Sequence, residues 1–172
     1  MESPADVAWW QRHQDTWELL AFDGREDGHG LPYDAASGDR RAVLEALLRA
    51  TGHKMPGFLR FLLVQEAAWH RHAWGFSPSI AMAALLVAEQ RDEDDVYLLW
   101  HAKSTSFDTL GGLPVELLFA AGVAETRARV LAEAHPDRDA LLTYLAQSGT
   151  PTDDQVEHRL SVMRAHFTSW PD

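Results

Sequence analysis

Apolar residues follow a helical spacing through almost the whole sequence, and this feature most limits how the chain can fold. Between turn signals, apolar residues recur at helical intervals in segments rich in Ala, Leu, Glu and Arg. Alternating runs of β-branched residues, which are typical of strands, do not occur. Because 172 residues is within the usual size of one domain, we expect a single all-α domain over residues 1–172. Its architecture should be a compact bundle of about eight helices.

Two neighbouring apolar segments predict the centre of this bundle. Residues 58–69 (FLRFLLVQEAAW) are apolar on nearly all sides, and residues 80–88 (IAMAALLVA) include no charged side chain. A helix that is apolar on all sides is buried on all sides. Gly75 favours an end to the first segment, and Ser77 followed by Pro78 is typical of a helix start. We therefore expect a tight antiparallel hairpin of two buried helices, covered by the others.

The remaining helices are predicted from the same spacing and from the turn residues between them. They are expected over residues 4–21, 40–51, 93–103, 114–122, 124–135, 137–147 and 152–167, with Pro114 at the first position of its helix. Thr152 and Gln155 form a capping-box pattern at the start of the last helix. The Gly- and Asp-rich segment 22–39 and the segment 104–112 (STSFDTLGG) are expected to be loops.

A weak internal repeat affects how these helices are expected to pack. Leu-Leu-Val-Ala at 85–88 is followed 32 residues later by Leu-Leu-Phe-Ala at 117–120. A period of this length suggests stacked helical hairpins, so we expect HEAT-like helical-array packing in part of the bundle. The consensus residues of tetratricopeptide and ankyrin repeats do not occur, and the repeat identifies no family.

The charge and the absence of cysteine narrow the function. Fifteen Lys and Arg against 26 Asp and Glu give a formal net charge of −11, which opposes binding to the phosphates of nucleic acids. An acidic surface suits a basic protein or peptide partner. Without cysteine the chain has no disulfide, thiolate ligand or cysteine nucleophile. Because no apolar run is long enough to span a membrane and residues 1–10 lack a signal-peptide pattern, we expect a cytoplasmic protein that binds no membrane.

Two groups of residues are candidates for binding a partner. The chain has seven tryptophans, and tryptophans at helix ends often line a groove. Of these, Trp9 and Trp74 are the two that we expect to be only partly buried. The negative charge that would attract a basic partner is concentrated in one stretch, Asp92, Glu93, Asp94 and Asp95.

The segment QEAAWHRHAW offers residues for catalysis. Glu66 and His70 are four residues apart and share one face of a helix, so they could pass a proton or bind a metal. His72 faces another direction, because positions two apart in a helix differ by about 200°. Histidine and arginine near a helix end are also favoured by the helix dipole, and we prefer this structural explanation of the segment to metal binding.

A metal at Glu66 and His70 would need a further ligand, because a catalytic metal usually has about three from the protein. The candidates for that ligand are His101, Asp108, Glu116 and His13. His101 precedes the polar segment 104–112, in which Asp108 could orient a histidine. No metal site is assigned on this basis, and the sequence names no cofactor.

These observations leave two hypotheses. The first, which we prefer, is a non-enzymatic interaction module that binds a basic protein or peptide, as inhibitors, immunity-type proteins and scaffolds do. The net charge and the absence of any catalytic motif favour it. The second is a small enzyme or ligand-binding protein with a pocket near the ends of the central helices. Its site residues would be Glu66, His70, His101 and Asp108, and their convergence on one cavity would favour it.

Overall fold

The computed structural model describes residues 5–50 and 55–169, and within these ranges the chain is helical with no β-sheet. The α-helices are α1 (Val7–Arg12), α2 (Ser37–Arg49), α3 (Pro56–His70), α4 (Pro78–Ala88), α5 (Val96–Ser104), α6 (Phe107–Gly112), α7 (Val123–Ala132), α8 (Arg138–Ser148) and α9 (Asp153–Thr168). Short 3₁₀ helices are η1 (Gln14–Leu20), η2 (Glu93–Asp95) and η3 (Val115–Phe119). The all-α fold predicted from the sequence is confirmed.

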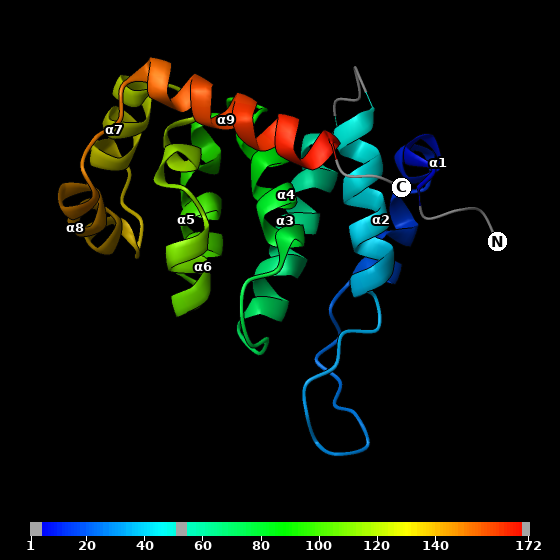
Figure 1. Cartoon of the computed structure of the whole chain (residues 1–172). Helices are drawn as coiled ribbons and strands as arrows, with labels where there is room; N and C mark the ends of the chain where they lie inside the picture. The colour runs from blue at the N-terminus through cyan, green and yellow to red at the C-terminus, as the bar shows by residue number, and fades with distance from the viewer. Residues whose placement is uncertain (1–4, 51–54, 170–172) are drawn as a thin grey trace.

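The hairpin of α3 and α4 lies at the centre of the molecule, between α2 and α5 (Figure 1). All of α4 from Ser79 to Ala88 is buried. Ser77 caps this helix by accepting a hydrogen bond from the Ser79 N–H, and Pro78 occupies the first turn, as predicted. The expectation that α3 is also buried on all sides is wrong, because α4, α5 and η1 cover only part of it and leave Val64 44% exposed.

Helix α9 crosses the ends of α2, α4 and α5, which stand side by side beneath it (Figure 1). The predicted capping box is present, with the Thr152 hydroxyl accepting from the Gln155 N–H and the Gln155 side chain accepting from the Thr152 N–H. Near the other end of α9, the Arg164 guanidinium donates to the Glu89 carboxylate and to the Leu48 carbonyl, each at 2.6 Å. Helix α9 therefore ties α2 to the end of α4.

The two halves of the sequence repeat, from which array-like packing was expected, differ in structure. Residues 85–88 lie in the α-helix α4, whereas residues 117–119 lie in the 3₁₀ helix η3. Pro114 stands at the N-cap of η3 with an extended backbone, rather than inside a helix. The repeat therefore reflects shared apolar spacing and not two equivalent helices.

The first predicted helix, over residues 4–21, is in fact two short helices. Helix α1 ends at Arg12, and His13 leaves the helical region with φ −120° and ψ 62° before η1 begins. This break brings Trp10 and Trp17 against the same ring, that of Phe58. The indole N–H of Trp17 donates to the Trp10 carbonyl at 3.1 Å, which holds the two helices together.

Residues 104–112 were expected to form a loop, and most of them form helix α6. Ser106 and Thr109 satisfy each other's backbone N–H groups in a capping box, which starts the helix despite the two glycines at its end. The Lys103 ammonium donates to the Leu110 carbonyl at 2.6 Å and also to the Leu113 carbonyl. These contacts satisfy carbonyls at the end of α6 that have no helical partner.

The second predicted helix begins earlier than expected. Helix α2 starts at Ser37 rather than at Arg40 and ends at Arg49, and its predicted end at Thr51 lies outside the described residues. Its apolar residues Val43, Leu44, Leu47 and Leu48 are buried. Among the described residues, no helix is both long and apolar enough to cross a membrane.

Candidate functional site

Glu66 and His70, the strongest catalytic candidates, are both buried in α3, each 1% exposed. The Nδ1 atom of His70 lies 2.7 Å from the Glu66 carbonyl oxygen, and its Nε2 atom lies 3.2 Å from the backbone nitrogen of Ser77. Because a backbone N–H can only donate, Nε2 accepts and Nδ1 carries the proton, which makes the ring neutral. Both ring nitrogens are therefore used within the fold, and neither is free to bind a metal or to exchange a proton with a substrate.

The Glu66 carboxylate belongs to a buried ionic network around Arg40, which is 0% exposed. The Arg40 Nε atom donates to Glu66 at 2.8 Å, and its terminal nitrogens donate to the Asp34 carboxylate and, at 3.1 Å, to the Leu20 carbonyl. Burial raises the pKa of the Glu66 carboxyl, while the charge of Arg40 opposes that rise. Burial has the larger effect, so Glu66 keeps its proton to a higher pH than an ordinary glutamate does.

His101 and Asp108 lie apart from that network, on the other side of the α3–α4 turn. The Arg71 guanidinium donates to the Nε2 atom of His101 at 2.9 Å. Partial burial, and secondly the charge of Arg71, lowers the pKa of His101. The Asp108 carboxylate accepts a hydrogen bond from the Gly75 N–H at 3.1 Å.

The four predicted catalytic residues are thus gathered around one turn but do not converge on one cavity. All four contact residues 70–77 directly or through a neighbour, and His70 is the one that lines a cleft there. Within residues 5–50 and 55–169, no three His, Asp or Glu side chains are grouped so that they could hold a metal ion.

The cleft beside His70, which we call the aromatic cleft, has a volume of about 330 Å³. It is lined by Leu31, Pro32, Trp69, His70, His72, Ala73, Trp74, Gly75, Phe76 and Ser77. One wall comes from the long loop between η1 and α2, and the other comes from the end of α3 and the turn to α4. Trp74 could be predicted from the sequence as a residue that contacts a partner. The cleft could not be predicted, because its two walls are about 40 residues apart along the chain.

Large apolar side chains are exposed in and beside the aromatic cleft. Trp74 is fully exposed, Leu31 is 61% exposed and Phe76 is 39% exposed. The adjoining helix α6 adds Phe107, which is 89% exposed, and it is joined to the cleft by the Asp108–Gly75 hydrogen bond. An exposed apolar group of this kind, next to a concave site, is typical of a surface that binds another protein.

The turn that presents Trp74 has a defined backbone. Gly75 has φ +88°, a conformation that residues with a side chain rarely adopt. Phe76 packs closely on Gly112, where a Cβ atom would lie 2.5 Å from the Phe76 ring. The hydrogen bond to Asp108 holds Gly75 and packing on Gly112 holds Phe76, while the Trp74 side chain itself lies in solvent.

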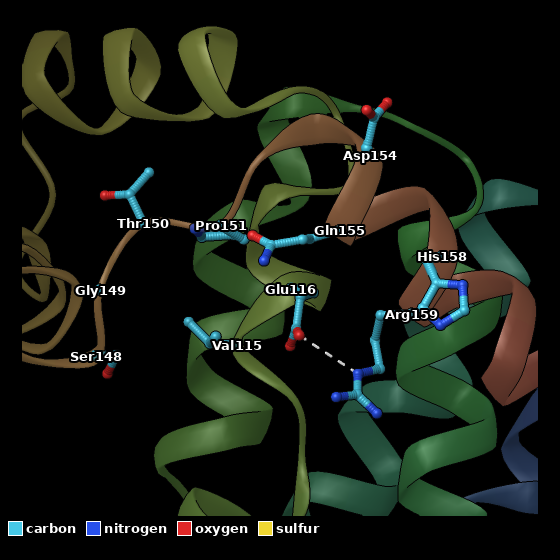
Figure 2. Close-up of a pocket in the computed structure, with 10 residues that line it drawn as sticks. All are labelled: Val115, Glu116, Ser148, Gly149, Thr150, Pro151, Asp154, Gln155, His158 and Arg159. Carbon is cyan, nitrogen blue, oxygen red and sulfur yellow. Dashed lines mark hydrogen bonds and ion pairs between the residues drawn. The ribbon is translucent and has the colours of Figure 1, made fainter.

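A second, larger cleft of about 550 Å³ lies between η3, the α8–α9 connection and α9 (Figure 2). Figure 2 shows the Glu116 and Arg159 side chains pointing toward one another, with 3.3 Å between the Oε1 and Nε atoms, whereas Asp154 points away from them. Glu116 was a candidate third metal ligand, and it pairs with Arg159 instead. The Arg159 side chain is exposed and the Glu116 side chain is partly buried, and these two charges in the cleft are paired with each other.

Three of the four residues in the acidic stretch predicted to bind a partner are ion-paired with arginines. The Arg60 guanidinium pairs with Asp92 and with buried Asp95, each at 2.6 Å, and Arg129 pairs with Asp94 at 2.7 Å. Among these acidic residues, Glu93 is exposed and makes no side-chain ion pair within 4.0 Å with residues 5–50 or 55–169.

Trp9 and Trp74, the two predicted aromatic contacts, lie in different surroundings. Trp9 is half-buried, with its ring stacked on His13 at 4.6 Å and edge-on to Trp10 at 4.8 Å. Trp74 is fully exposed at the aromatic cleft. Neither side chain is fully buried, as expected, but Trp74 alone belongs to a concave site.

Comparison with known protein families, with curated proteins and with solved structures finds no match to this chain.

Proposed function

We propose that this chain is a protein-interaction module, and that its aromatic cleft receives an apolar side chain of a basic protein or peptide. The observation that carries the proposal is the full exposure of Trp74 in the lining of that cleft. Tryptophan is strongly enriched among the residues that contribute most to protein–protein binding. A large aromatic side chain held in solvent gains free energy when a partner buries it.

The net charge of −11 supports a basic partner. Because the acidic stretch 92–95 is mostly ion-paired, we assign attraction of the partner to the charge of the whole chain and not to that stretch. Charge of this kind acts over about 10 Å at 0.1 M salt and speeds encounter, whereas the apolar contact supplies most of the affinity. The cytoplasmic location and the absence of nucleic-acid binding, both expected from the sequence, stay predictions.

The alternative, a small enzyme that uses Glu66, His70, His101 and Asp108, has less support. His70 has no free ring nitrogen, and Glu66 is paired with Arg40. His101 and Asp108 each hold part of the α3–α4 turn. No polar group of this set is directed at a shared space where a substrate could react.

The proposal can be tested by photo-crosslinking in the cell of origin. A photo-reactive residue replaces Leu31 on one wall of the cleft, and in a matched control it replaces Leu131, which is also exposed but lies on α7. We expect a covalent adduct with a basic protein from position 31, absent from position 131 and lost when Trp74→Ala is added. The same adducts from both positions, or an adduct that persists in the Trp74→Ala variant, would refute the proposal.

A further inference from the structure

Arg40 joins both ends of the loop that forms one wall of the aromatic cleft. One terminal nitrogen donates to the Leu20 carbonyl, just before the loop, and the guanidinium also binds the Asp34 carboxylate, near its end. Leu31 and Pro32, which line the cleft, lie between these two points. A single buried guanidinium therefore closes the base of the loop.

The body of the loop is bonded mainly to itself. Residues 23–33 are all exposed. The Asp27 carboxylate accepts from the N–H groups of His29 and Leu31, at 2.8 and 3.0 Å. The Phe22 N–H donates to the Gln65 side chain at 3.0 Å, which gives the start of the loop one further contact with α3. The position of the loop relative to α3 thus depends on contacts at its ends.

Glu66 links Arg40, at the base of the loop, to the wall of the aromatic cleft that the α3–α4 turn forms. Its carboxylate accepts from Arg40, and its backbone carbonyl accepts from the Nδ1–H of His70. The Nε2 atom of His70 then accepts from the N–H of Ser77, which lines the other side of the cleft. A continuous chain of hydrogen bonds runs from the loop to the α3–α4 turn, and each of its side chains is at least nine-tenths buried.

We infer that Arg40, Glu66 and His70 are positioning residues that set the spacing of the two walls of the aromatic cleft. Buried ionic groups contribute little net stability compared with apolar residues, but they can define one arrangement of the elements that they join. The relevance of this spacing to binding rests on the proposed function, whereas the spacing itself can be measured on the protein alone.

The test measures the distance from the loop to a fixed reference. The chain contains no cysteine, so spin labels attach only at the two introduced cysteines, Leu31→Cys and Val162→Cys. Val162 is exposed on α9 and provides the reference position. Pulsed electron–electron double resonance measures the distance between the two labels. In otherwise unchanged protein it should give one narrow distance distribution. Glu66→Met removes the acceptor for Arg40 and leaves the balanced Arg40–Asp34 pair, and we expect it to broaden the distribution at least twofold.

Two further variants separate positioning from general disruption. Glu66→Gln keeps an acceptor oxygen for Arg40 and should restore the narrow distribution. Glu133→Met breaks another carboxylate–guanidinium pair, that with Arg129 on α7, which holds neither the loop nor α9, and it should leave the distribution unchanged. A folded Glu66→Met variant with the narrow distribution would overturn the inference, and so would equal broadening by Glu133→Met.

If Glu66→Met does not fold, Asp34→Ala tests the same inference. It releases the end of the loop from Arg40 and leaves the balanced Arg40–Glu66 pair. Broadening supports the inference, and an unchanged distribution overturns it. This outcome is independent of the proposed function. Crosslinking at position 31 that is insensitive to Trp74→Ala would refute binding at the cleft while leaving the spacing result intact.

Discussion

The Nε2 atom of His70 accepts a hydrogen bond from the Ser77 N–H at 3.2 Å, so the last residue of α3 holds the residue that caps α4. The same ring donates to the Glu66 carbonyl within α3. His70 therefore fixes the geometry of the central hairpin and carries one wall of the aromatic cleft. A residue that sequence reasoning marked as a catalytic candidate has a structural role that its spacing alone does not reveal.

Replacing His70 with alanine should destabilise the protein strongly. The change leaves the Ser77 N–H without a partner and opens a cavity in a fully buried place, and together these effects cost about 3 kcal/mol. Urea denaturation followed by circular dichroism measures this change. The control is His158→Ala, an exposed histidine on α9, for which we expect a change within about 0.5 kcal/mol. Equal stability of the two variants would contradict the role of His70.

His101 should stay neutral to a lower pH than an ordinary histidine. Partial burial and the nearby Arg71 lower its pKa below 6.5. The unfolded chain therefore takes up a proton at this position before the folded protein does, and the His101 contribution to stability falls as the pH drops below 6.5. NMR titration of the ring measures the pKa. We expect Arg71→Gln to raise it, and an unchanged value would show that Arg71 has no influence on His101.

Truncation inside α4 should have a larger effect than truncation on the open side of α3. Leu85 is fully buried, so Leu85→Ala should reduce the free energy of unfolding by about 3 kcal/mol. Val64→Ala, at a position 44% exposed, should cost less than about 1 kcal/mol. Denaturant unfolding of both variants gives the comparison, and a reversed order would contradict the packing of α3 and α4.

Much of the fold could be predicted from the sequence because its main signals are local. The apolar run 80–88 fixes α4, and the Thr152–Gln155 pair fixes the start of α9. Helix α6 was missed because its glycines outweighed a capping box formed by Ser106 and Thr109, side chains that are equally common in turns.

The site could be predicted only in part, because its contacts join distant residues. Arg40 looks like an ordinary surface residue at the start of a helix, and nothing local indicates that it meets Glu66, which is 26 residues away. The aromatic cleft exists only when Leu31 and Trp69 are brought together by the fold. Trp74 could be predicted to be exposed, since it follows a helix end next to a glycine.

Association with a basic partner should slow as salt is added. Raising the ionic strength from about 0.05 to 0.5 M shortens the screening length from roughly 14 to 4 Å, which removes long-range attraction. Stopped-flow measurements on the partner found by crosslinking should show the association rate falling about tenfold or more, with little change in the dissociation rate. A salt-independent association rate would contradict a role for the net charge.

The central claim is that Trp74 provides the main apolar contact with a partner. Calorimetric titration of that partner into unchanged protein, the Trp74→Ala variant and the Leu131→Ala control measures this directly. We predict that Trp74→Ala weakens binding about 30-fold, the equivalent of about 2 kcal/mol, while Leu131→Ala has no effect. Binding by the Trp74→Ala variant within about threefold of the unchanged protein would contradict the account.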